Sequence, residues 1–145
     1  MNKILVLGGG SWGTTLGNLL AEKEHDVTLW ARNSKIFKKV KNYWTNNQYL
    51  PKYKISKNLK IVSDLKDAFL DVDLVIVAIP SKGFRSISSK ISKYLDNQKI
   101  LIASKGIENE SFMTMSEVFV DETNHSKKNI MVLSGPNIAD EIMRK

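Results

Sequence analysis

A glycine-rich segment near the N-terminus has the residue types and spacing of a phosphate-binding turn. Residues 8–13, Gly-Gly-Gly-Ser-Trp-Gly, match the pattern G-x-G-x-x-G. The pattern alone is weak, but here it follows an apolar run and opens a helical one, the context in which it binds dinucleotides. Gly8 would allow a tight turn, Gly10 would let a pyrophosphate reach the backbone, and Gly13 would let the next helix pack closely. A glycine turn without a ligand is the alternative.

The end of the second apolar run bears on the choice of cofactor. The usual fingerprint places an acidic residue about 20 residues after the glycines, where it binds the ribose 2′-OH of NAD. Here the run ends Leu-Trp-Ala-Arg at residues 29–32, without a carboxylate. An arginine at this corner accommodates the 2′-phosphate of NADP, although Arg32 could instead be a surface residue stacked over adenine. The expected cofactor is therefore NADP or NAD, with NADP slightly preferred.

Small polar segments follow three later apolar runs, where the carboxyl ends of parallel strands would meet. They are residues 78–81 (Ala-Ile-Pro-Ser), 103–106 (Ala-Ser-Lys-Gly) and 133–137 (Leu-Ser-Gly-Pro-Asn). Lys105 is the only cation among them. Near a nicotinamide its ammonium group could bind an anionic substrate or polarise a carbonyl. The spacing by itself favours the simpler reading, a solvated lysine before a glycine turn.

The two histidines and the paired carboxylates do not indicate a second site. They are interpreted as surface groups without the spacing of a metal site or a catalytic pair: His25, His125, Asp71, Asp73, Glu108 and Glu110. Because the chain has no cysteine, a disulfide framework and a thiolate site are excluded. No metal is expected.

Apolar patterning supplies the elements that would position these segments. Continuous apolar runs predict strands at residues 3–7, 26–30, 59–62, 74–79, 99–103 and 129–133. Helical patterns predict helices at 12–23, 34–41, 63–70, 83–95 and 111–121, and a last helix from Ile138 onward, with Ser34 and Ser111 as N-caps. Residues 43–58 are polar and aromatic and are expected to form a long loop on the surface.

Strands that are apolar throughout and separated by helices indicate parallel strands covered on both faces. The prediction is an α/β fold of the Rossmann type, a doubly wound and mostly parallel sheet with helices on both faces. With 145 residues, the chain is expected to form one NAD(P)-binding domain over residues 1–145.

Composition narrows the class of partner. The net charge is +7, but only three of the 22 basic residues are arginine, and the lysines are scattered along the chain. Nucleic-acid surfaces favour arginine because its planar fork makes two hydrogen bonds at once, so no nucleic-acid partner is expected. The longest apolar stretches, such as residues 74–79, are too short to span a membrane. The N-terminal run lacks a cleavage site, and a cytoplasmic location is predicted.

Six segments together resemble bacterial glycerol-3-phosphate dehydrogenase. They occur in order between Lys3 and Glu141: residues 8–14, 29–32, the Tyr-Leu-Pro of 49–51, 78–81, 103–108 and 133–139. The resemblance implies reduction of dihydroxyacetone phosphate to sn-glycerol 3-phosphate with NAD(P)H, a reaction that feeds phospholipid synthesis.

The resemblance also implies roles for individual residues. Lys105 matches a lysine that touches both cofactor and substrate, and Gly135 and Asn137 match substrate contacts. The expected cofactor-binding residues are Gly8, Gly10, Ser11, Trp12, Gly13, Arg32, Pro80, Lys105 and Ala139. Two positions depart from the family, because Asn137 stands where serine or threonine is frequent and Ala31 where glycine is frequent.

Length is the main departure. Members of the resembled family continue into a helical C-terminal domain that supplies the proton-transferring lysine and most of the substrate pocket, and that domain is absent from this chain. We therefore expect cofactor binding with little or no turnover, and a homodimer is one possibility for a full-length protein. The alternatives are a 2-dehydropantoate reductase or β-hydroxyacid dehydrogenase domain, disfavoured by residues 104–106 and 134–136, and a non-catalytic nucleotide-binding module.

Overall fold

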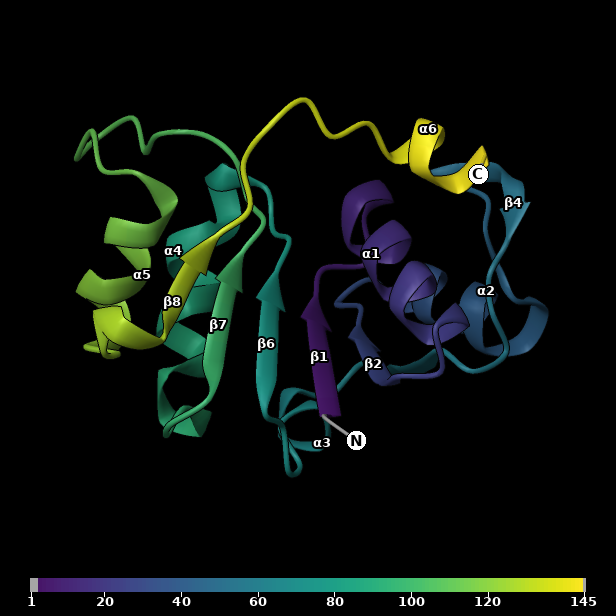
Figure 1. The fold of residues 1–145 in the computed structure, drawn as a ribbon, viewed down its shortest axis with the longest axis horizontal. Coiled ribbons are helices and arrows are strands. Elements are labelled where there is room, and N and C mark those ends of the chain that lie inside the picture. Colours follow the sequence, from purple (N-terminus) through teal and green to yellow (C-terminus); the bar gives the residue numbers. More distant parts are fainter. Residues whose placement is uncertain (1–2, 145) are drawn as a thin grey trace.

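Six short strands form one parallel sheet at the centre of the molecule (Figure 1). The computed structural model describes residues 3–144. The strands are β1 (Lys3–Leu7), β2 (Asp26–Trp30), β5 (Lys60–Val62), β6 (Leu74–Val77), β7 (Lys99–Ile102) and β8 (Ile130–Val132). Their order across the sheet, β5-β2-β1-β6-β7-β8, is the order of the doubly wound Rossmann fold. The predicted fold class and all six predicted strands are confirmed.

Helices cover both faces of this sheet. They are α1 (Ser11–Glu22), α2 (Ser34–Tyr43), α3 (Leu65–Ala68), α4 (Ser81–Ile91), α5 (Met115–Thr123) and α6 (Ala139–Arg144), with 3₁₀ turns η1 (Ser92–Tyr94) and η2 (Lys127–Asn129). Alternate residues of β1 point to opposite faces. Leu5 and Leu7 are buried with α4 and α5, whereas Ile4 and Val6 are buried with α1 and α2. No helix in the described part of the chain is long and apolar enough to cross a membrane.

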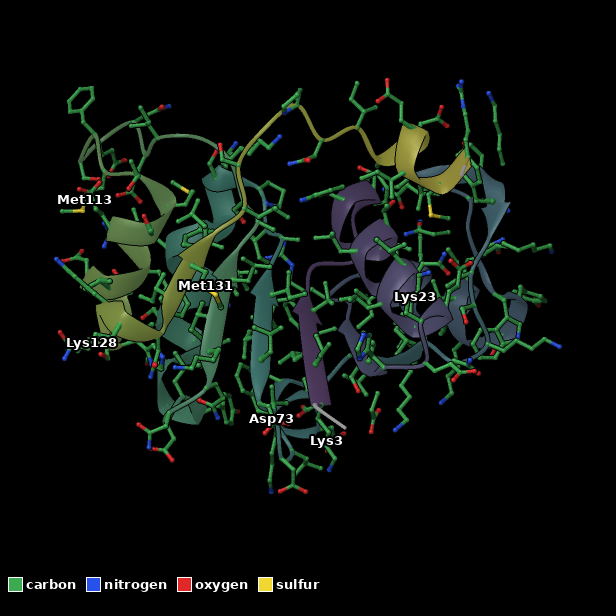
Figure 2. The ribbon with its side chains drawn as sticks, viewed as in Figure 1. Lys3, Lys23, Asp73, Met113, Lys128 and Met131 are labelled. Carbon is green, nitrogen blue, oxygen red and sulfur yellow. The ribbon has the colours of Figure 1, made fainter. Side chains whose placement is uncertain are left out.

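The amino ends of the strands form the edge opposite the glycine turn, and Figure 2 shows Lys3 and Asp73 there. The Lys3 backbone N–H donates to the Asp73 carboxylate at 2.8 Å, and the Lys3 ammonium pairs with Asp71 at 3.1 Å. Both aspartates are exposed, as expected. They lie far from the carboxyl ends of the strands, where ligands of such sheets bind.

The expected loop at residues 43–58 is wrong in its middle. Residues Thr45–Asn46 (β3) and Leu50–Lys54 (β4) pair as an antiparallel hairpin. Leu50 and Ile55 are each only 3% exposed and join the core on the α1 side of the sheet. Burial of these two apolar side chains against α1 and α2 is what folds the segment back onto the domain.

Both predicted N-caps are also wrong. Asn33, not Ser34, caps α2 by accepting the Lys35 N–H at 2.9 Å. Helix α5 begins after Thr114, which forms a capping box with Glu117.

His125, expected at the surface, is 7% exposed. Its Nε2 lies 2.9 Å from the Gln98 carbonyl oxygen, and its ring packs edge-on against Phe119. A backbone carbonyl from a distant segment satisfies the buried imidazole, so the histidine belongs to the core. His25 is exposed, as expected.

Candidate functional site

The turn from β1 into α1 is packed so closely that glycine is required at two positions. Gly8 has φ +122°, and a Cβ there would lie 2.3 Å from the Ala78 carbonyl oxygen. A Cβ on Gly13 would lie 1.9 Å from the carbonyl oxygen of Gly8. A Cβ on Gly10, by contrast, would meet no heavy atom within 4 Å. The turn is therefore closely packed against neighbouring backbone at Gly8 and Gly13 and open at Gly10.

Two hollows meet at this open point, where β1 lies between β2 and β6 and the direction of strand addition reverses. One hollow of about 590 Å³ extends toward Arg32, and the other, of about 370 Å³, extends toward Lys105. Both are lined by Gly10, Tyr49 and residues 78–80. Together they form a continuous groove across the carboxyl ends of the central strands, the usual ligand position in open α/β sheets.

The first hollow ends at Arg32, directly after β2. Trp30 also lines this hollow, and its ring is fixed because its Nε1–H donates to the Ser63 carbonyl at 3.0 Å. The Arg32 side chain is exposed and has no hydrogen-bond or ion-pair partner among the side chains that the structure describes. Its guanidinium is thus available to an anion at this end of the groove.

The second hollow ends at Lys105, which directly follows a buried serine. Ser104 Oγ accepts the Ile79 N–H at 2.9 Å and donates to the Val77 carbonyl at 3.1 Å. These bonds hold the chain after β7 against the chain after β6. Lys105 therefore leaves a fixed backbone, and its ammonium group donates to the carbonyl oxygen of Gly135. The structure brings together two residues that the sequence analysis assigned to the substrate.

Residues 133–138, here called the strap, carry Gly135 and Asn137 across the top of the sheet from β8 to α6 (Figure 1). At one end Leu133 N–H donates to the Ile102 carbonyl at 2.9 Å. At the other end, beyond the strap, the Tyr53 hydroxyl on β4 donates to the Asp140 carboxylate at 2.7 Å. This hydrogen bond lowers the pKa of Asp140 and raises that of Tyr53. The strap is therefore tied at both ends.

Most of the expected site residues line the groove. Gly8, Gly10, Ser11, Trp12, Arg32, Pro80, Lys105 and Asn137 are among its lining residues. Gly13 lies buried beneath the turn, and Gly135 reaches the groove through its bond to Lys105. Ala139 is only partly buried and packs in the same core cluster as Trp12.

Two residues that line the second hollow carry buried donors without a partner in the described structure. They are the indole N–H of Trp12 and the side-chain amide nitrogen of Asn137. Buried donors are nearly always hydrogen-bonded in native proteins, so these two nitrogens are exceptions within residues that line the second hollow.

Residues 3–145 match the family model described as the NAD-dependent glycerol-3-phosphate dehydrogenase N-terminus. The chain belongs to this family. The resemblance seen in the sequence is thus confirmed, and the family match decides against the reductase and hydroxyacid dehydrogenase alternatives.

Relatives of the glycerol-3-phosphate dehydrogenase family share both sequence and fold with the chain. It is 41% identical over 143 residues to glycerol-3-phosphate dehydrogenase [NAD(P)+] of Carboxydothermus hydrogenoformans, covering 98% of this chain and 43% of that protein. Glycerol-3-phosphate dehydrogenase [NAD(P)+] of Teredinibacter turnerae is 39% identical over 143 residues, covering 98% of this chain and 42% of that protein. The crystal structure of glycerol-3-phosphate dehydrogenase from Coxiella burnetii superposes with a TM-score of 0.90 at 31% identity, over 99% of this chain and 43% of that one. The chain spans about two fifths of the length of these dehydrogenases.

Among the buried polar residues that sequence analysis did not identify in this glycerol-3-phosphate dehydrogenase domain, one contacts the glycine turn. Asn46, on β3, is 1% exposed. Its side-chain nitrogen donates to the Gly9 carbonyl at 3.0 Å and to Thr14 Oγ1 at 2.8 Å. The Tyr-Leu-Pro resemblance drew attention to the neighbouring residues 49–51 but gave no role to Asn46.

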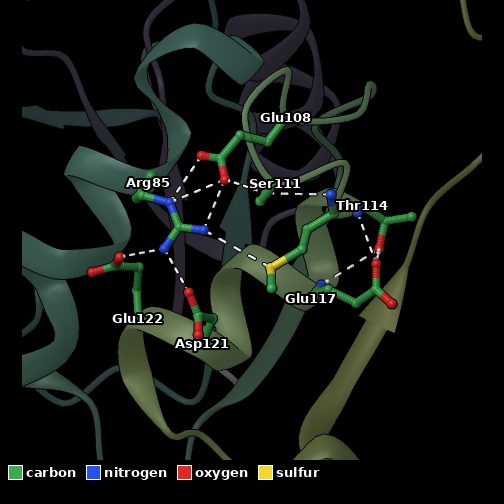
Figure 3. Close-up of polar contacts among 8 residues, drawn as sticks. Arg85, Glu108, Ser111, Thr114, Glu117, Asp121 and Glu122 are labelled. Atoms are coloured by element: carbon green, nitrogen blue, oxygen red, sulfur yellow. Dashed lines mark hydrogen bonds and ion pairs between the residues drawn. The ribbon is translucent and has the colours of Figure 1, made fainter.

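An ion-pair cluster joins the segment that follows β7 to α4 and α5 (Figure 3). Arg85 of α4 binds both carboxylate oxygens of Glu108, at 2.7 to 3.1 Å. The same guanidinium contacts Asp121 at 2.6 Å and Glu122 at 2.5 Å on α5. The expectation that Glu108 is a solvated carboxylate is therefore wrong, because a guanidinium fork binds it. The hydrogen bonds from Arg85 and then from Ser111 lower the pKa of Glu108 to about 2.

This depressed pKa predicts a pH dependence of stability. The folded pKa lies below the usual glutamate value of about 4.3, so the contribution of Glu108 is complete above that value and is lost as the pH falls toward 2. We expect the Glu108→Gln variant to have a lower free energy of unfolding than the parent at pH 7, and the difference to shrink between pH 5 and pH 2. Urea titrations at several pH values measure this, and a pH-independent difference would contradict it.

Proposed function

We propose that the chain binds NAD(P) along the groove and is the cofactor half of a longer glycerol-3-phosphate dehydrogenase. The observation that carries the proposal is the open backbone at Gly10, placed between one hollow with an exposed arginine and another with a lysine. A dinucleotide has the matching chemistry, with a pyrophosphate between two nucleosides.

The start of α1 fits a pyrophosphate. Gly10 is the N-cap of this helix of 12 residues, and among the described residues no side-chain cap hydrogen bond is made at this end. No acidic residue stands in the first turn. Free N–H groups and the positive end of the helix dipole favour phosphate at such a place. We therefore assign the pyrophosphate to Gly10 and Ser11, above the closely packed Gly8 and Gly13.

The two ends of the groove would then hold the two nucleosides. The adenosine ribose would lie in the hollow that ends at Arg32, where a guanidinium can bind a 2′-phosphate in two places. The nicotinamide would lie in the hollow lined by Trp12, Pro80 and Lys105. In this arrangement NADP is preferred over NAD.

The substrate would be dihydroxyacetone phosphate or sn-glycerol 3-phosphate, bound between Lys105 and the strap. A bound nicotinamide supplies or accepts the hydride. The Lys105 ammonium, which donates to Gly135 in the structure, would turn to the substrate oxygen and stabilise the negative charge that develops there. Asn137 would contact the substrate from the strap. Residues outside this chain would complete the pocket and move the proton.

The test is a titration of the chain with NADPH and NADH, followed by tryptophan fluorescence, together with Arg32→Ala. Loss of a charge-assisted hydrogen bond costs about 1.5–3 kcal/mol, so the variant should bind NADPH roughly 10 to 100 times more weakly. Its affinity for NADH should change little. Lys128→Ala removes the same charge at a site far from the groove (Figure 2) and should leave both affinities unchanged.

Two results would contradict the proposal in different ways. If neither nucleotide binds to the unmodified chain, the cofactor assignment fails. If both bind and Arg32→Ala weakens them equally, the groove binds a dinucleotide but Arg32 does not select the 2′-phosphate.

A further inference from the structure

We propose that Asn46 is a positioning residue for phosphate binding, because its buried amide holds the Gly9–Gly10 peptide with the Gly10 N–H turned toward the groove. This inference rests on the proposed function. It assigns to the β3–β4 hairpin a part in cofactor binding although the hairpin lies outside the glycine motif.

The orientation of the Asn46 amide is fixed by its partners. Gly9 offers a carbonyl oxygen, which can only accept a hydrogen bond, so the group that faces it at 3.0 Å is the NH₂ of Asn46. The second N–H of this group donates to Thr14 Oγ1 at 2.8 Å. Both hydrogens are thereby used, one on the turn and one on the first turn of α1.

Fixing the Gly9 carbonyl also fixes the next N–H. The described chain has no cis peptide bond, and in a planar trans peptide the C=O and the following N–H point to opposite sides. With the Gly9 carbonyl held toward the hairpin, the Gly10 N–H points away from it. This N–H has no partner among the described residues. Gly10 lines both hollows, and a Cβ on it would meet no heavy atom within 4 Å.

The peptide is held from two other directions. A Cβ on Gly9 would lie 2.8 Å from the Ala31 methyl group and 3.2 Å from Ile36, so the backbone at this residue is packed against the end of β2 and against α2. The hairpin that carries Asn46 is itself anchored by Leu50, which is buried and pairs with Asn46 in the strand register. Asn46 is therefore held in place by the hairpin, and the Gly9–Gly10 peptide that it contacts has little room to rotate.

The experiment compares two ligands on the same chain. ADP-ribose contains the pyrophosphate, whereas adenosine 2′-monophosphate offers the adenosine end alone. In Asn46→Leu, which fills similar space without a donor, we expect ADP-ribose to bind about tenfold more weakly, equivalent to one hydrogen bond to a charged group. Adenosine 2′-monophosphate should bind as it does to the parent. Asn46→Ala provides the same comparison if the leucine variant does not fold.

Thr14→Val is the matched control. It removes the other acceptor of the Asn46 amide but keeps the bond to Gly9, so the ratio of the two affinities should stay at the parent value. In ¹⁵N spectra of the parent, the Gly10 amide signal should move on addition of ADP-ribose, and in Asn46→Leu this movement should be lost.

The outcomes separate this inference from the proposed function. If ADP-ribose does not bind to the parent chain, the proposed function fails. If ADP-ribose binds to the parent and to Asn46→Leu equally well, the function stands and the role of Asn46 is overturned. Equal weakening of both ligands would also overturn it, since that is the effect of a general loss of structure.

Discussion

Replacing Gly13 by alanine is expected to destabilise the domain by about 3 kcal/mol, the upper range for overpacking a close contact. Alanine normally stabilises a helix relative to glycine by up to about 1 kcal/mol, so the expected sign is reversed here. The reason is that the new methyl group would lie 1.9 Å from the backbone oxygen of Gly8. Neither backbone can yield without opening the turn. For a domain of this size the melting temperature should fall by roughly 10 °C.

Gly10→Ala is the matched comparison, since a methyl group there meets no atom within 4 Å. The φ of Gly10 is −74°, which alanine adopts without strain. Its melting temperature should stay within about 2–4 °C of the parent, because alanine is worse than glycine as an N-cap by about 1 kcal/mol. Its methyl group would occupy the space proposed for the pyrophosphate, so NADPH affinity should be lost. Equal melting temperatures for the two variants would contradict the geometry of the turn.

Lys105→Met is expected to have the largest effect on catalysis. Because the chain spans 43% of the Carboxydothermus relative, the test uses residues 1–145 fused to the remaining part of that relative. Loss of a group that stabilises developing negative charge lowers the rate by about 10²–10³-fold. We expect a loss of this size in kcat/KM for dihydroxyacetone phosphate reduction. Lys105→Arg keeps the charge but alters its geometry and should be intermediate.

Lys128→Met in the same fusion controls for a lost positive charge, because Lys128 lies at the far side of the sheet from the groove (Figure 2). It should retain parental activity. An inactive parental fusion would speak against this chain as the cofactor half, whereas an active Lys105→Met fusion would speak against Lys105 alone.

Much of the fold could be read from the sequence because parallel strands are buried on both faces. Such strands are apolar throughout, and the runs at residues 3–7 and 74–79 give that signal directly. The glycine turn was equally predictable, because close backbone contacts allow only glycine at Gly8 and Gly13.

Tertiary contacts decided what the sequence could not predict. Strand β3 has two residues, too short for any alternation of polar and apolar side chains. Ser111 has the right residue type for an N-cap, but its hydroxyl binds Glu108 at 2.6 Å instead. The burial of His125 depends on the Gln98 carbonyl, a neighbour that no local pattern shows.

In the candidate site, too, the sequence predicted the residues at strand ends but not the contacts between distant segments. Strand ends placed Lys105 at the groove, because carboxyl ends of parallel strands meet at one edge. Its contact with Gly135 depends on the path of the strap, and the support of Gly9 by Asn46 depends on the hairpin. Both contacts join segments about 30 residues or more apart, which local sequence spacing does not reveal.

The place of β1 in the middle of the sheet has a consequence for synthesis on the ribosome. Domains fold as their residues emerge, N-terminal parts first, and β1 can pair with β2 once residue 30 has emerged. Its other edge must wait for β6 at residues 74–77. During that interval the apolar face of the nascent sheet and its open strand edge are exposed. The hairpin is made in this same interval, and its buried Leu50 belongs to the core on the α1 side of the sheet, so we expect that face to be covered before the other one.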